Sequence, residues 1–400
     1  MQLNADSLSE SEVKEDDDLG PSEVSLKALE LSKKKRKRKN KKKKPFNPTS
    51  KSSEDNLEDE VEKSVREVNQ LLGEASEINP QDQDQEPVQK RGLLSIEPKN
   101  LNPENEMKRL FGSKVVMADF RHKRGNQRHR HLRASHWLVV PKPSWPQPGK
   151  TGLTMKFLES DKQGNQFFTF EHSPAYQNVQ KRFFHAVDSL NPEFIIQLLN
   201  DHPFHIDAML QLSDICKMGE DSTRAAELIE RTLYAMEAAF HPLFNLAVGT
   251  SRLDYRRQEN RAFFIALFRH ITYVGARACH RTALEFCKLT LGLDPHNDPL
   301  GVLLMLDFYA IRAQQHSWFI EFVESWDPQR NLTQLPNMAY SMALAKFYSC
   351  KNNDYAEADE RIQKALIEFP GVLLPLLDKC SVDIDKRVLG SQFFLDAQSK

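Results

Sequence analysis

The sequence predicts an all-α protein whose main part, residues 173–390, is a degenerate tetratricopeptide-like α-solenoid. A small strand-containing strap and a disordered, charged N-terminal arm precede it. The solenoid is predicted because apolar residues recur at helical spacing in paired segments, with small residues where two helices would cross. Prolines separate these pairs at intervals of 39, 53, 33 and 42 residues, at Pro203, Pro242, Pro295, Pro328 and Pro370.

The N-terminal arm, residues 1–90, is predicted to be disordered. It contains no Trp or Tyr and a single Phe, Phe46, although the chain as a whole carries 24 Phe among its 400 residues. A segment this polar buries too little apolar surface to offset the conformational entropy of its backbone. Charge is also segregated along the chain, because 55 basic and 56 acidic residues nearly cancel while the arm holds separate acidic and basic stretches.

A polybasic run at residues 33–44 is the main candidate for nucleic-acid binding. Basic side chains occupy every position of this run except Asn40. They are Lys33, Lys34, Lys35, Arg36, Lys37, Arg38, Lys39, Lys41, Lys42, Lys43 and Lys44. Such a run binds phosphates strongly and in a salt-dependent way. The alternatives are a nuclear localisation signal or a solubilising tail.

Residues 55–72 carry a narrow apolar stripe that predicts one short helix. Leu57, Val61, Val65, Val68 and Leu72 are spaced three or four residues apart, which places them on one helical face. The stripe fits a helix that docks on a partner. The alternative is a transient helix with no role, since short isolated helices are marginal in water.

The strap, residues 91–172, is rich in Pro, Trp, Arg and His. Its cations are predicted to bind RNA together with Trp137 and Trp145, because arginine beside aromatic rings suits exposed bases. These cations are Arg121, Lys123, Arg124, Arg128, Arg130 and Arg133. The alternative is that the two tryptophans pack on the solenoid. Strand-like segments at 153–158 and 166–170 flank a turn signal and predict a hairpin.

The solenoid carries an insert at roughly residues 248–260, where the interval between prolines is longest. Arginines, acids and a tyrosine lie there between apolar helices. The insert is compatible with a partner-binding loop, for which the candidates are Tyr255, Arg256, Arg257 and Arg261. The alternative is an internal ion-pair network that fixes the angle between neighbouring hairpins.

Motifs for catalysis, metals, cofactors or membrane insertion are not found, so we predict a binding protein without catalytic residues, metal or cofactor. Gly149-Lys150-Thr151 resembles the end of a phosphate-binding loop, but Ser144 stands where that loop needs its first glycine. The five cysteines show no CxxC spacing and fit reduced, buried thiols. No run approaches the roughly 20 apolar residues that a membrane span needs.

Seven strings of the sequence occur in a specific order. They are Leu101–Gly112, Trp137–Pro146, His241–Phe244, Arg252–Arg257, Glu259–Arg261, Arg330–Asn337 and Phe369–Leu377. Together they resemble the transcription factor 25 family, also called nuclear localised protein 1, whose fungal counterpart is ribosome quality control complex subunit 1. The resemblance covers residues ~56–395.

The resemblance implies a non-enzymatic subunit of the ribosome quality control complex. The implied partners are the 60S ribosomal subunit with its ribosomal RNA, a listerin-type ubiquitin ligase, ubiquitin and the valosin-containing AAA ATPase. Such a protein favours lysine-48-linked ubiquitin chains on a stalled nascent peptide, and is cytosolic and ribosome-associated with a nuclear pool. The alternative is a nuclear, DNA-associated transcriptional regulator, with the polybasic run as its import signal.

Overall fold

The computed structural model describes residues 92–112, 137–146, 151–350 and 354–398 of the chain. All of these residues belong to one compact unit. The predicted polybasic run, the short helix at 55–72 and the cations from Arg121 to Arg133 lie outside the described residues.

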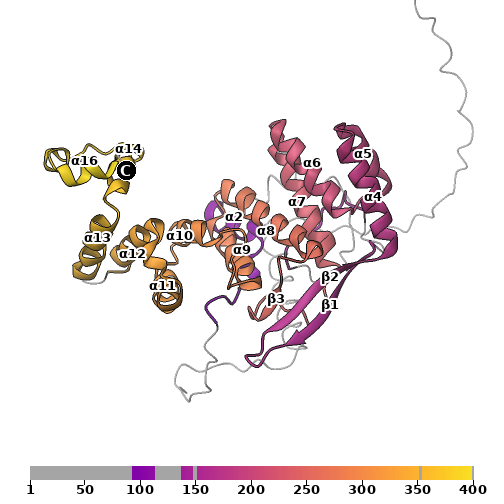
Figure 1. Cartoon of the computed structure of the whole chain (residues 1–400), viewed down its shortest axis with the longest axis horizontal. Coiled ribbons are helices and arrows are strands. Elements are labelled where there is room, and N and C mark those ends of the chain that lie inside the picture. The colour runs from indigo at the N-terminus through magenta and orange to yellow at the C-terminus, as the bar shows by residue number, and fades with distance from the viewer. Residues whose placement is uncertain (1–91, 113–136, 147–150, 351–353, 399–400) are drawn as a thin grey trace, which may run out of the picture. The chain divides into compact units, whose positions relative to one another are not determined.

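Helices in consecutive pairs form most of the described chain (Figure 1). The pairs are α4 (Pro174–Asp188) with α5 (Pro192–Asp201), α6 (Ile206–Met218) with α7 (Ser222–Glu237), α8 (Gln258–Ala276) with α9 (His280–Leu293), α10 (Leu303–Arg312) with α11 (His316–Arg330), and α12 (Pro336–Ser349) with α13 (Ala356–Glu368). Each helix packs against the next one along the chain, and α10 also packs against α12. The prediction of a mostly helical protein is confirmed, while the tetratricopeptide-like type of the repeat stays a prediction.

The same tight turn joins the two helices in four of these pairs. One non-glycine residue in each turn adopts the left-handed conformation, with φ between 57° and 62°, and the second helix begins two residues later. These residues are Leu190, Glu220, Ala278 and Gln314. A left-handed residue ends a helix abruptly and reverses the chain. The left-handed position is not glycine in any of the four turns, and these four pairs share one connecting geometry.

The five prolines that suggested the pairing do mark the second helix of each pair. Pro203, Pro242, Pro295 and Pro370 follow α5, α7, α9 and α13. Pro328 differs, because it lies inside the last turn of α11 rather than after it.

A small sheet accompanies the helices. Strands β1 (Leu153–Ser160) and β2 (Gln166–His172) form the predicted antiparallel hairpin. A third strand, β3 (Ser251–Leu253), pairs in parallel with β2, so the order is β1-β2-β3. The all-α class therefore needs correcting to a helical protein with a three-stranded sheet. Sequence reasoning missed β3 because three residues are too few to show an alternating pattern, and their partner strand is remote in the sequence.

Aromatic side chains join the sheet to the helices. Phe168 and Phe170 of β2 are almost fully buried. The Phe168 ring lies 5.0 Å from that of Phe244, and the Phe170 ring lies 5.7 Å from that of Phe263 on α8, both edge to face. Phe240 completes the group at 4.7 Å from Phe244. Edge-to-face pairs of this kind add stability beyond the burial of their area.

Short elements complete the described chain. They are η1 (Pro98–Asn100), α2 (Pro103–Phe111), η2 (Leu332–Gln334), η3 (Pro370–Val372), α14 (Leu373–Lys379), α15 (Lys386–Leu389) and α16 (Gln392–Gln398). In the part of the chain that the structure describes, no helix has the length and apolar character needed to cross a membrane.

His270 is an ionisable group in the middle of the core. It lies on α8 with its ring 4.6 Å from that of Phe286, and neither ring nitrogen has a hydrogen-bond partner within the described residues. Burial lowers its pKa from 6.5 to about 3, because a charged imidazole would lose its hydration. The native state therefore holds this residue neutral.

We expect stability to fall on acidification in a way that depends on His270. Below pH 6.5 the unfolded chain binds a proton at this residue and the folded chain does not, so protonation favours unfolding. Between about pH 7.5 and about pH 5 the free energy of unfolding should fall by about 2 kcal/mol from this residue alone. His270→Leu should lose that part of the pH dependence in urea unfolding. The exposed control His296→Gln should keep it, and a His270→Leu variant with the full wild-type dependence would contradict the assignment.

Candidate interaction surfaces

The first strap segment, residues 92–101, is bound along α9 and α11 through its backbone. The Glu97 amide donates to Glu285 Oε2 at 3.1 Å, and Trp318 Nε1 donates to the carbonyl oxygen of Leu93 at 3.0 Å. Residues 92–97 form no helix or strand of their own, so side chains of the helices satisfy some of their backbone polar groups.

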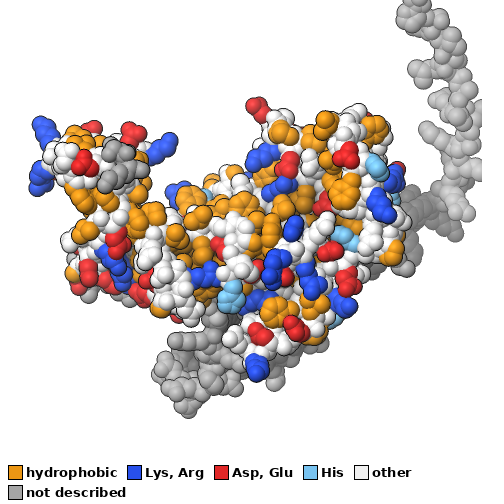
Figure 2. All heavy atoms as spheres, in the orientation of Figure 1, with side chains coloured by type: hydrophobic (Ala, Val, Ile, Leu, Met, Phe, Trp, Pro, Cys, Tyr) orange, Lys and Arg blue, Asp and Glu red, His pale blue; other side chains and the backbone are white. Residues whose placement is uncertain are grey.

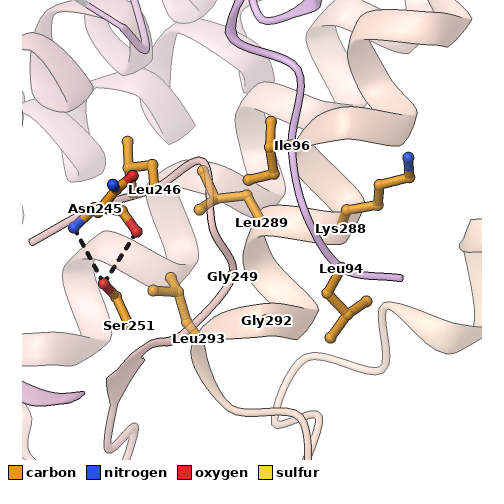
Figure 3. A pocket seen from close by; sticks show the side chains of 10 residues that line it. All are labelled: Leu94, Ile96, Asn245, Leu246, Gly249, Ser251, Lys288, Leu289, Gly292 and Leu293. Atoms are coloured by element: carbon orange, nitrogen blue, oxygen red, sulfur yellow. Dashed lines mark hydrogen bonds between the residues drawn. The ribbon is translucent and has the colours of Figure 1, made fainter. Parts of the chain in front are cut away.

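Apolar contacts also hold this segment against α9. Figure 3 shows Leu94 and Ile96 of the strap beside Leu289 and Gly292 of α9, with the loop through Gly249 passing alongside. Gly249 has φ +74°, and a Cβ atom there would lie 2.8 Å from the carbonyl oxygen of Leu94. Glycine is therefore required at this crossing of loop and strap.

Glu285 is the ionic centre of this contact. Its side chain is fully buried, forms an ion pair with Arg281 Nη2 at 3.1 Å and accepts from Lys288 Nζ at 3.2 Å. The Lys288 ammonium lies 4.3 Å from the centroid of the Trp318 ring, in cation–π geometry. Burial lowers the pKa of Lys288, which the nearby Glu285 carboxylate partly opposes. One carboxylate thus joins the strap, α9 and α11.

Glu106 of α2 supplies a cap to α9. Its two carboxylate oxygens accept from the amides of Arg281 and Thr282, each at 2.8 Å. The N-cap residue Cys279 makes no side-chain capping bond of its own. A carboxylate at the start of a helix binds otherwise unpaired amides and interacts favourably with the helix dipole.

The second strap segment, residues 137–146, is held along α7 by carboxylates that accept hydrogen bonds from it. Glu237 accepts from the backbone amides of Trp137 and Leu138, the second at 3.2 Å. Burial raises the pKa of Glu237, and the amides that donate to it act in the opposite direction. Glu227 accepts from Trp145 Nε1 and from Lys142 Nζ, both at 2.9 Å.

The two candidate tryptophans have different surroundings. The Trp145 side chain is 8% exposed and lies 5.7 Å from the Tyr234 ring, so it belongs to the packing between strap and helices. This geometry matches the alternative role that the sequence left open for it. Trp137 is 38% exposed and remains accessible to a partner.

The candidate residues of the insert come together where α8 begins. The Arg261 guanidinium lies 5.7 Å from the Tyr255 ring centroid and donates through Nε to the Tyr255 carbonyl at 3.2 Å. Arg256 is exposed and pairs with Asp254 at 3.1 Å, and Arg257 is also exposed. We call Tyr255, Arg256, Arg257 and Arg261 the arginine cluster.

A fourth arginine of the insert, Arg252, has an internal role. Its guanidinium donates to the carbonyl oxygens of Gly249 at 2.8 Å and Gly292 at 2.6 Å, and to Asn165 Oδ1 at 2.8 Å. It therefore joins the β1–β2 turn, the insert and the end of α9. Arg252 thus has a structural role, while partner binding by the arginine cluster stays a prediction.

The carboxylates that bind the strap were missed by sequence reasoning. Glu285 carried a signal, because it and Lys288 are the only charged residues in the mainly apolar stretch of α9 from Ala283 to Leu293. A charged residue in such a helix needs a buried partner. Glu106, Glu227 and Glu237 carried no comparable signal, since they lie in amphipathic helices where a charged face is expected.

Within the ranges that the structure covers, no group of three or more His, Cys, Asp or Glu side chains could hold a metal ion. The features present are stacked helix pairs, a strap fixed to them and exposed arginine and apolar side chains. They define a helical scaffold with surfaces suited to binding other macromolecules.

Comparison with known proteins identifies the family. A family model described as Transcriptional repressor TCF25 matches residues 168–400. Two relatives named Ribosome quality control complex subunit TCF25, from Homo sapiens and Mus musculus, are each 46% identical over 300 residues, which is 73% of this chain and 44% of theirs. Ribosome quality control complex subunit 1 of Schizosaccharomyces pombe is 35% identical over 287 residues, 72% of this chain and 42% of its own. No solved structure matches.

The chain therefore belongs to the TCF25 family, as its sequence strings predicted. It spans less than half the length of these curated relatives. Two of the strings, Leu101–Gly112 and Trp137–Pro146, include some of the strap residues that contact the helices.

Removing the Glu285 carboxylate should destabilise the fold severely. In Glu285→Ala, Lys288 and Arg281 lose their buried counterion, and breaking a buried pair in this way costs roughly 3–5 kcal/mol. The free energy of unfolding from urea titration measures the effect. Glu321→Ala, an exposed glutamate on α11, is the matched control and should change stability by less than ~0.5 kcal/mol. Equal stability of the two variants would contradict the central role of Glu285.

Proposed function

We propose that this chain is a non-enzymatic subunit of the ribosome quality control complex that binds 60S ribosomal subunits carrying a stalled nascent chain. It supports ubiquitination of the stalled peptide with lysine-48-linked chains and its extraction by the valosin-containing AAA ATPase. The observation that carries the proposal is family membership, with relatives at 46% and 35% identity that are named as subunits of this complex.

The charge distribution supports contact with ribosomal RNA. The polybasic run from Lys33 to Lys44 and the strap cations from Arg121 to Arg133 provide dense positive charge in the sequence. The arginine cluster adds exposed guanidinium groups next to the Tyr255 ring, an arrangement suited to phosphates and stacked bases. We infer that these three regions bind ribosomal RNA, with the polybasic run supplying most of the affinity.

The helices support a role as an adaptor. Stacked helix pairs present an extended surface on which several partners can bind side by side. Trp137, exposed next to α7, is a candidate contact for the listerin-type ligase or for ubiquitin.

A second candidate function is that of a nuclear, DNA-associated regulator. The name of the family model, Transcriptional repressor TCF25, favours it. In this alternative the polybasic run is a nuclear import signal and the protein has no affinity for the ribosome.

Sucrose-gradient sedimentation under stalled translation distinguishes the two functions. The full chain should co-sediment with 60S particles if it is a quality-control subunit. Replacing the basic residues of the run from Lys33 to Lys44 with Gln should weaken this co-sedimentation and reduce its salt dependence. Each lost phosphate contact lowers the slope of log affinity against log salt by ~0.7–0.9.

A control variant separates specific contacts from overall charge. The triple change Arg256→Gln, Arg257→Gln and Arg261→Gln should weaken co-sedimentation. The same number of exposed cations removed near the C-terminus, by Lys379→Gln, Lys386→Gln and Arg387→Gln, should have a smaller effect. A wild-type chain that stays at the top of the gradient would contradict the adaptor function and favour the regulator.

A further inference from the structure

Exposed apolar side chains gather on α10 and α12. Their exposed fractions range from 41% to 65%, which is unusual for large apolar side chains on adjoining helices. Hydrophobic side chains also appear on the face drawn in Figure 2, over the part of the chain that these helices occupy in Figure 1. We call this surface the apolar ridge, made of Leu304, Phe308, Leu344 and Tyr348.

A buried polar contact places the two halves of the ridge side by side. Asp307 of α10 accepts hydrogen bonds from Asn337 at 3.1 Å and from Ser341 at 2.7 Å, both on α12. Leu304 and Phe308 lie next to Asp307 on α10, three residues before and one after. On α12, Leu344 and Tyr348 of the ridge follow Ser341 by three and seven residues. The ridge therefore flanks one hydrogen-bonded seam on its solvent side.

Histidines at the starts of the preceding helices support the aromatic rings. His280, the first residue of α9, lies 5.9 Å from the Phe308 ring, edge to face. His316, the first residue of α11, stacks on Tyr348 at 5.0 Å. Burial lowers the pKa of both histidines, so both are neutral at pH 7. This repeated support holds both aromatic side chains in place, which reduces the entropy that a partner would lose on binding.

One uncompensated positive charge lies at the end of the ridge. Arg312 follows Leu304 and Phe308 at four-residue spacing on α10 and is exposed. Its Nε lies 3.4 Å from His280 Nε2, and within the described residues its guanidinium forms no ion pair with a carboxylate. A ligand that covers the ridge would gain a charge-assisted contact by presenting an acidic group at this end.

We propose that the apolar ridge binds an amphipathic helix of a partner protein, with apolar residues facing α10 and α12 and an acidic residue facing Arg312. Rows of side chains on two packed helices form the surface that a third helix uses, with anchors at positions i, i+3 or i+4, and i+7. The charge of Arg312 complements an acidic partner and opposes a basic one. The proposal rests on this surface alone and is independent of ribosome binding.

A random peptide library displayed on phage tests the proposal with the full chain as target. Peptides of about 15 residues are long enough to form a helix on binding. Enriched peptides should carry apolar residues at helical spacing and Asp or Glu at one end. Their affinity, measured by fluorescence anisotropy, should fall at least tenfold in Phe308→Ser and in Tyr348→Ser, which corresponds to about 1.4 kcal/mol.

A charge exchange makes the test specific. Arg312→Glu should lower the affinity for the acidic peptide. A peptide with Lys in place of its acidic residue should bind this variant better than it binds the wild type. Phe194→Ser, at a 49% exposed phenylalanine on α5, is the matched control and should leave the affinity unchanged. Circular dichroism melting should show that the ridge variants fold like the wild type.

Three results would overturn the proposal. Selected peptides could lack the apolar spacing, or they could bind Phe308→Ser and Phe194→Ser equally well. Sedimentation velocity could instead show a wild-type dimer that Phe308→Ser dissociates, in which case a second copy of the chain covers the ridge.

Discussion

The buried Glu285 carboxylate is the interaction on which the arrangement of strap and helices depends. A charge without water around it requires partners, and Glu285 has three: Arg281, Lys288 and the amide of Glu97. Two of these partners come from α9 itself, and the third comes from an extended segment that is remote in the sequence. The strap therefore cannot leave without removing a hydrogen bond from a buried anion, so the helix and the strap position each other.

Two more carboxylates extend the same principle along the helices. Glu106 comes from the strap and completes the start of α9, while Glu237 belongs to α7 and binds the strap's own amides. Strap and helices thus exchange hydrogen bonds in both directions. Arg252 donates hydrogen bonds to the end of α9 and to the β1–β2 turn. These bonds hold the insert, which carries the arginine cluster, against the rest of the fold. The candidate surfaces are consequently borne by a preorganised scaffold, which suits an adaptor.

The sequence predicted those features whose signals are local. Helical periodicity and the prolines predicted the helix pairs, and the turn after Ser160 predicted the β1–β2 hairpin. It did not predict β3, the carboxylates that bind the strap or the apolar ridge, because each depends on residues far apart in the chain. Leu304 and Tyr348 are residue types that usually lie in a core. Only the packed structure of α10 and α12 shows that both face solvent. The family, by contrast, was identified from ordered strings without any knowledge of their contacts.

Amide hydrogen exchange of the strap tests the central claim most directly. If buried carboxylates make the strap part of the folded scaffold, the amides of Glu97 and Leu138 should exchange only through the same large opening that exposes the amides in the middle of α9. Their free energies of opening, measured in the native state, should then be equal to those of α9. Fast exchange at Glu97 and Leu138 beside a protected α9 would show that the strap detaches on its own, and would contradict the account.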